Sequence, residues 1–254
     1  MALFIDGCIS AIDDLAAQDS QLLDIASEEG INVTQKIALA QDAIGLELLE
    51  LLHGLRPLDW PLWLVREPDL GQIVVTPPLK LWNTYLSLEM VYRDAYSDQL
   101  NDRYGAKRDQ FQQLAGAARE KLVQIGLGIT VNPVRRAATP QLIAAPGSLP
   151  DGTYYATMSW VNRVGEDGAS AVPDAITTLS SSFAVQPVMP PGNAAGWNVY
   201  VGAAPESMVL QNGAPIAMGQ TWDQPANLVT TGRAPGNGQR PDYLKPIPRA
   251  IRRG

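Results

Sequence analysis

The chain has 254 residues, of which 46% are hydrophobic, and a formal net charge of −7. This composition fits one large domain or two modest ones with an ordinary core. The negative balance argues against a general nucleic-acid coat, because phosphate binding needs clustered Lys and Arg. Cys8 is the only cysteine, so no intrachain disulfide is possible, and no apolar run reaches the length of a bilayer. The sequence predicts a soluble protein made in the cytoplasm.

Apolar residues at three- and four-residue spacing predict an N-terminal helical domain. We expect Ser10 to cap the first helix and Gly105 to separate the last two, which form a long antiparallel pair. The predicted helices span residues 11–29, 35–52, 79–104 and 106–125.

Residues 55–78 change character, because five prolines break any helix while Trp60 and Trp63 keep the segment apolar. We interpret it as a long ordered connection that lies against a neighbouring subunit. The aromatic residues of the third helix favour a core or a subunit interface over a ligand groove. They are Trp82, Tyr85, Tyr92 and Tyr96.

Alternating apolar and polar residues predict short strands in the second half of the chain. The clearest runs from Gly196 to Gly202, where Trp197, Val199 and Val201 share one face of a half-buried strand and Asn198 and Tyr200 share the other. The Asn-Gly step at Asn212 predicts a hairpin between 208–210 and 214–218. Further strands are expected at 129–131, 152–161, 175–179 and 182–186.

The predicted fold class is therefore α+β with two domains. A helical domain spans 1–135, a linker 136–150, a small antiparallel β-sandwich of immunoglobulin or fibronectin type III type 151–230, and an extended basic arm 231–254. The Gly-, Pro- and Asn-rich stretch 231–239 is not expected to order by itself.

Residue patterns for catalysis are weak, and we predict no enzyme, no cofactor and no metal. His53 is the only histidine, and we interpret it as a helix-end residue beside Gly54. Cys8 has no second thiol and is interpreted as a buried structural residue. Gly126-Leu127-Gly128 lacks the third glycine of a dinucleotide-binding fingerprint.

Charge is distributed unevenly, since residues 1–130 contain 19 acidic and 10 basic residues and residues 131–254 contain 7 and 9. Three interpretations of the basic C-terminal end stay open, namely contact with DNA, a solvated chain end and an arm that docks on an acidic neighbour. The residues concerned are Arg240, Tyr243, Lys245, Arg249, Arg252 and Arg253.

Two segments carry a resemblance to known families. Pro78 to Trp82, continuing through Tyr92-Arg93-Asp94-Ala95-Tyr96 and Asn101-Asp102-Arg103-Tyr104, resembles the helical core of head–tail adaptor proteins of tailed bacteriophages. The passage 196–202, with Leu210-Gln211-Asn212-Gly213, resembles immunoglobulin-like or fibronectin type III modules of virion proteins.

The adaptor resemblance implies a structural virion protein at the neck, without membrane contact. Twelve copies would form a ring that joins the portal to the tail or a stopper protein, and double-stranded DNA would pass through its lumen without sequence-specific contacts. The alternative is a tail or baseplate decoration protein whose β-sandwich binds host-surface glycan, with Tyr155 and Tyr200 stacking on sugar rings.

Overall fold

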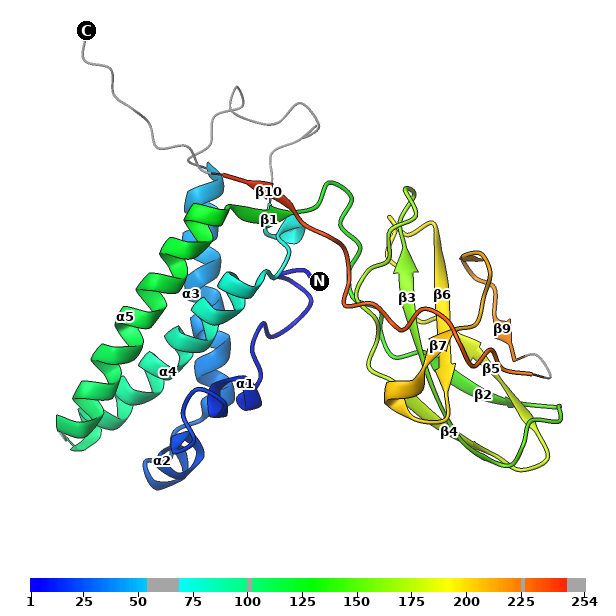
Figure 1. Cartoon of the computed structure of the whole chain (residues 1–254), viewed down its shortest axis with the longest axis horizontal. Helices are drawn as coiled ribbons and strands as arrows, with labels where there is room; N and C mark the ends of the chain where they lie inside the picture. The colour runs from blue at the N-terminus through cyan, green and yellow to red at the C-terminus, as the bar shows by residue number, and fades with distance from the viewer. Residues whose placement is uncertain (54–68, 100–101, 225–226, 246–254) are drawn as a thin grey trace, which may run out of the picture. The chain divides into compact units, whose positions relative to one another are not determined.

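The computed structural model describes residues 1–53, 69–99, 102–224 and 227–245, and it confirms a mixed α+β fold with antiparallel sheets (Figure 1). The backbone contacts divide the chain into two compact units. The helical unit contains Gly7–Val131 and Pro241–Gly254, and the β unit contains Met1–Asp6 and Asn132–Arg240. Both units are thus assembled from segments that are far apart in the sequence.

The first predicted helix is wrong, because residues 11–29 form two short helices, α1 (Ile12–Ala16) and α2 (Leu22–Glu28). The break lies at Asp19, whose carboxylate accepts the Gln21 N–H at 3.0 Å and competes with a helical backbone. Ser10 does not cap α1 either. Its hydroxyl lies 2.9 Å from Thr84 Oγ1, where it joins the start of the chain to α4.

Three long helices form the body of the helical unit. They are α3 (Val33–His53), α4 (Pro77–Gln99) and α5 (Asp102–Ile125), and α4 packs against both of the others. The prediction that Gly105 ends a helix is wrong, because it lies buried inside α5. A Cβ at Gly105 would lie 3.1 Å from Tyr96 Cε2, so the missing side chain serves the close approach of α4 and α5.

The C-terminal part of the chain returns to the helical unit as a strand. β1 (Leu127–Ile129) pairs antiparallel with β10 (Asp242–Leu244), with Ile129 opposite Asp242. The 3₁₀ helix η2 (Leu70–Gln72) precedes α4 and contributes a hydrogen bond from Thr130 N to Gln72 O at 2.8 Å. The extended arm predicted to begin at 231 is therefore held in place as far as β10.

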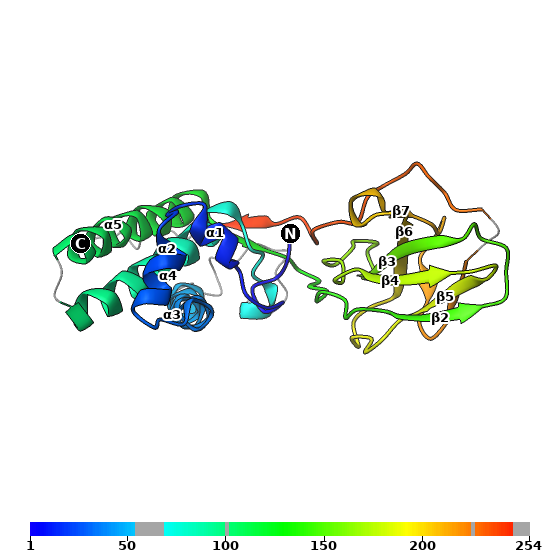
Figure 2. The ribbon, with the colours of Figure 1, turned by 90° about the horizontal axis from the view of Figure 1, so that it is seen from below.

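The β unit contains two antiparallel sheets (Figure 2). Both sheets contribute side chains to one hydrophobic cluster. The cluster includes Trp160, Phe183 and Trp197, each at most 1% exposed. The first sheet has the order β2 (Gln141–Ala145), β5 (Ser182–Gln186) and β9 (Trp222–Asp223). The second has the order β4 (Asp174–Thr178), β3 (Gly152–Val161), β6 (Gly196–Gly202) and β7 (Val209–Leu210), and β8 (Ile216–Ala217) also pairs with β6.

Two sequence predictions are wrong in this unit. The expected linker 136–150 contains β2, which pairs with β5 along its whole length. The expected Asn-Gly hairpin does not form, because β7 and β8 both pair with β6 and not with each other. Asn212 instead acts on the central strand, where its Oδ1 accepts the Val199 N–H at 2.9 Å and its Nδ2 donates to Asn198 Oδ1 at 2.8 Å.

Strand β6 is buried on both faces, which corrects the expectation of a half-buried strand. Tyr200, on the face opposite Trp197, is 0% exposed. The segment 231–239 runs over this second face, and Arg233 lies with its guanidinium 5.8 Å from the Tyr200 ring centroid. Arg233 O accepts the Leu210 N–H at 2.9 Å, and Gly236 O accepts the Ser170 hydroxyl at 2.9 Å. Hydrogen bonds to the sheet thus order a segment that has little apolar surface.

Gly202, at the end of β6, gives a test of this packing. A Cβ there would lie 2.7 Å from Met208 N, whereas a Cβ at Gly213 would meet no atom within 4 Å. We expect Gly202→Ala to lower the free energy of unfolding by about 1–3 kcal/mol, the usual effect of overpacking. Gly213→Ala is the matched control and should stay within about 0.5 kcal/mol of the wild type in urea unfolding. Equal stability of the two variants would contradict the close approach.

Candidate functional site

The four aromatic residues predicted on the third helix occupy two environments. Trp82 and Tyr92 are 5% and 1% exposed, so both side chains belong to the packing of the helical unit. Tyr85 and Tyr96 are half-buried. Tyr85 stacks on Phe111, and Tyr96 lies 5.0 Å from the Arg108 guanidinium carbon. These contacts leave only Tyr85 and Tyr96 partly accessible to a partner.

Asp19 anchors the turn between α1 and α2 to the long helices. Its Oδ2 accepts the Tyr92 hydroxyl at 2.6 Å and the Lys107 ammonium at 3.0 Å. Burial raises the pKa of the Asp19 carboxyl, but the hydrogen bonds from Tyr92 and Lys107 outweigh burial and hold the pKa below its usual value. Burial and the same hydrogen bond raise the pKa of Tyr92. Asp19 therefore stays ionised and serves the fold.

A groove of about 480 Å³ lies between the three long helices. We call it the α3–α5 groove. Its walls come from α3 and α5 and its floor from α4, and an ion pair of 2.8 Å between Glu47 and Arg119 joins the two walls. The Arg119 guanidinium carbon lies 6.0 Å from the Trp82 ring centroid. The groove is lined by Ala43, Ile44, Glu47, Trp82, Leu86, Glu89, Arg93, Gln112, Ala115, Gly116 and Arg119.

Glu89 is the unusual side chain of this groove. The residue is 8% exposed, yet its carboxylate accepts no hydrogen bond from any residue that the structure describes. Its one ion pair there is with Arg93, at 3.8 Å, which is too long for a hydrogen bond. Burial raises the pKa of the Glu89 carboxyl, against the opposing effect of Arg93. A buried carboxylate with such weak compensation favours an incoming cation.

A second, apolar hollow of about 290 Å³ lies on the surface of α4 and α5. Leu81 and Ile125, which line it, are 40% and 44% exposed. Among the described residues that line it, Lys121 is the only one with a charged side chain. Exposed apolar surface of this kind is typical of protein–protein contacts.

The predicted basic end lies partly within the described residues. Arg240 and Lys245 are exposed, and Tyr243, in β10, is 49% exposed. A Cβ at Gly126 would lie 3.2 Å from Lys245 Cγ, so the basic end begins beside the C-terminus of α5. The remaining predicted interface residues, Trp60, Trp63, Arg249, Arg252 and Arg253, lie outside the described residues.

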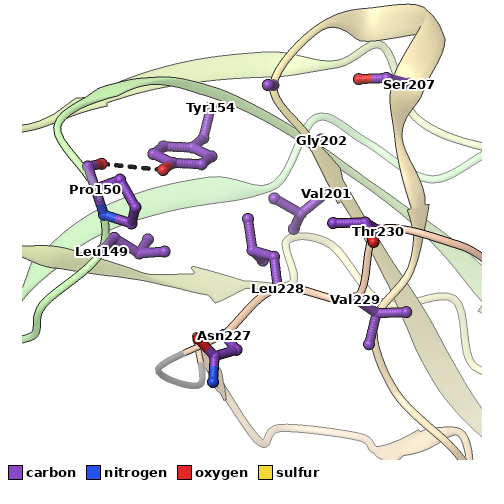
Figure 3. A pocket seen from close by; sticks show the side chains of 11 residues that line it. Leu149, Pro150, Tyr154, Val201, Gly202, Ser207, Asn227, Leu228, Val229 and Thr230 are labelled. Carbon is purple, nitrogen blue, oxygen red and sulfur yellow. Dashed lines mark hydrogen bonds between the residues drawn. The ribbon is translucent and has the colours of Figure 1, made fainter.

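The β unit contains a pocket of about 410 Å³ (Figure 3). Leu149, Val201 and Leu228 line it, and the Tyr154 hydroxyl at its edge donates to Pro150 O at 2.9 Å. Tyr200, proposed above to stack on a sugar, is buried beneath Arg233 and cannot do so. The lining is mainly apolar, and its polar side chains among the described residues are Tyr154, Ser207, Asn227 and Thr230.

A polar network that the sequence did not reveal holds segment 231–239 on the sheet. Arg233 pairs with Asp167, and Asp167 Oδ1 accepts the Asn198 amide at 2.7 Å. A second network is centred on Gln239, which is 3% exposed. Its side chain donates to Asn132 O and Glu166 Oε2 and accepts the Val134 N–H. Both networks explain how a Gly- and Pro-rich segment becomes part of the fold.

Cys8 is exposed, so its prediction as a buried thiol is wrong. His53 is the last residue of α3, as predicted. Among the described residues, no three His, Cys, Asp or Glu side chains gather closely enough to hold a metal ion. In the same part of the chain, no helix combines the length and apolar character that crossing a membrane requires.

Comparisons of the chain with protein-family models, with curated proteins and with solved structures gave no match. The functional argument therefore depends on the residues and surfaces described above.

Proposed function

We propose that the protein is a structural component of a virion, a head–tail adaptor that forms a ring of twelve copies between the portal and the tail or a stopper protein. The β1–β10 pairing is the observation that carries this proposal. Because of this pairing, the basic C-terminal end follows a strand of the helical unit. The exposed apolar hollow and the α3–α5 groove belong to the same unit. Double-stranded DNA passes through the lumen of such a ring.

Ring formation requires a donor surface and a different acceptor surface on every copy, because a head-to-tail interface closes only in that way. The helical unit offers both kinds of surface. The basic residues after β10 are suited to be a donor, and the α4–α5 hollow and the α3–α5 groove are suited to be acceptors. The β unit, which has a core of its own, is then an immunoglobulin-like accessory module on the ring.

The experiment is co-assembly with a portal protein, the partner that the proposal requires. Purified full-length protein and portal are mixed, and the mass of the complex is measured by native mass spectrometry. We expect a discrete complex with a fixed number of copies close to twelve. A glycan array is the control for the decoration-protein alternative, for which we expect no specific binding. A protein that stays monomeric beside portal and binds glycans would contradict the adaptor proposal.

A further inference from the structure

The α3–α5 groove has a shape and a charge pattern that call for an occupant carrying both apolar and cationic groups. Its floor is apolar at Trp82 and Leu86, and Glu89 lies between the two walls with only the long contact to Arg93. Isolated carboxylates that are nine-tenths buried are rare in proteins unless a cation or several hydrogen bonds compensate them. Two arginines line the groove, but Arg119 pairs with Glu47 at 2.8 Å and Arg93 reaches Glu89 only at 3.8 Å. Among the described residues, none donates a direct hydrogen bond to the Glu89 carboxylate, which leaves it able to bind a further cationic group.

The C-terminal segment 246–254 has the matching chemistry. Its sequence, Pro-Ile-Pro-Arg-Ala-Ile-Arg-Arg-Gly, alternates isoleucines with Arg249, Arg252 and Arg253 and contains no acidic residue. A guanidinium can donate two hydrogen bonds to a carboxylate, which suits Glu89. The isoleucines suit the apolar floor.

The position and length of the segment allow it to reach another copy. It follows Lys245, which lies beside Gly126 at the end of α5. Nine extended residues span at most about 30 Å, roughly the diameter of a small domain. The overall charge also favours such an exchange, because residues 1–130 have 19 acidic against 10 basic residues.

We propose that the α3–α5 groove is the acceptor site for segment 246–254 of a neighbouring copy, with Glu89 binding an arginine of that segment. The choice of a neighbouring copy rests on the proposed ring, since each copy then donates one arm and accepts another. The interface is heterologous and can close into a ring.

The first test uses the full-length protein and measures its self-association by sedimentation equilibrium. We expect Glu89→Gln to weaken self-association at least tenfold, because the neutral amide loses the charged contact. The variant should fold, since Gln has nearly the same shape and removes an unfavourable buried charge. Glu120→Gln, an exposed position on α5, is the matched control and should associate like the wild type. An unchanged association constant for Glu89→Gln would overturn the proposal.

The second test is independent of ring formation. A fluorescent peptide of residues 244–254 is added to the full-length protein, and binding is measured by anisotropy beside its effect on self-association. We expect the peptide to bind wild type at least tenfold more tightly than Glu89→Gln and to dissociate the assembly. A peptide in which all three arginines are glutamine should do neither.

The two measurements test the groove proposal and the ring proposal separately. Peptide binding that depends on Glu89, in a protein that remains monomeric with and without portal, would contradict both the neighbouring copy as donor and the proposed adaptor function. A complex with portal that Glu89→Gln and the peptide leave unchanged would overturn the groove proposal alone.

Discussion

We expect the helical unit to fold alone in a shortened chain. In this chain a Met precedes Gly7, and Asn-Gly replaces Val131–Arg240. The reason is the β1–β10 register, in which Ile129 lies opposite Asp242 and the two strands run antiparallel. Two residues between Thr130 and Pro241 would close them as a hairpin, and Asn-Gly is the preferred sequence for such a turn. The excised segment has its own hydrophobic cluster, whose residues are distinct from those of the cluster in the helical unit.

Circular dichroism and thermal unfolding check this expectation. The shortened chain should show a strongly helical spectrum and one cooperative transition. Leu244→Asp in the same shortened chain is the control, because Leu244 is 5% exposed in β10 and an aspartate there should open the hairpin. A shortened chain that is unfolded or aggregated, while the full chain is stable, would show that the helical unit depends on the β unit.

Asp19→Asn is expected to lower the free energy of unfolding of the helical unit by about 2–3 kcal/mol at pH 7. The side chain is 4% exposed, and the substitution leaves the Lys107 ammonium without its counter-charge. We place the loss below the range for a fully buried pair because the Lys107 side chain is 35% exposed. Tyr92→Phe, which removes one hydrogen bond to Asp19, should cost about 1 kcal/mol.

The pH dependence of this effect has a definite sign. The folded-state pKa of Asp19 is depressed, so its stabilisation is present above the unfolded-state pKa of about 3.9 and is lost as the pH falls through the folded-state value. Urea unfolding should therefore show a gap between wild type and Asp19→Asn at pH 7 that narrows below about pH 4. Asp24→Asn, at an exposed position in α2, should show no gap at either pH. A gap that widens in acid would contradict the role given to the carboxylate.

The periodicity of apolar residues predicted those helices and strands that bury a regular set of side chains. The helices α3 and α5 and the strands β3, β5 and β6 were all found close to their predicted positions, because burial on a fixed face gives a repeat of 3.6 or 2 residues. The fold class follows from this repeat. The relation of the structure to immunoglobulin-like modules stays a prediction.

Contacts between residues far apart in the chain could not be predicted from the sequence. The pairing of Leu127 with Leu244 joins residues far apart in the chain, and neither strand is long enough to show alternation. Segment 231–239 has a composition typical of disorder, yet Arg233 and the Gln239 network tie it to the sheet. The Asn-Gly step did not form the predicted hairpin turn. The Asn212 side chain instead accepts a hydrogen bond from the Val199 N–H of β6.

The candidate site was predicted only in part. Trp82 and Glu89 are seven residues apart on α4, which places both on the helix face that the groove exposes. This spacing is visible in the sequence, but the burial of Glu89 comes from α3 and α5 and is not. Without knowledge of this burial, the sequence does not distinguish Glu89 from the other acidic residues of the helical domain.

The most direct test of the adaptor proposal is electron microscopy of the purified full-length protein, alone and with the portal protein. The proposal predicts closed rings of twelve copies with a central opening wide enough for double-stranded DNA, in which the Glu89 groove of each copy is filled by residues 246–254 of the next. Single particles of one copy under both conditions would contradict it.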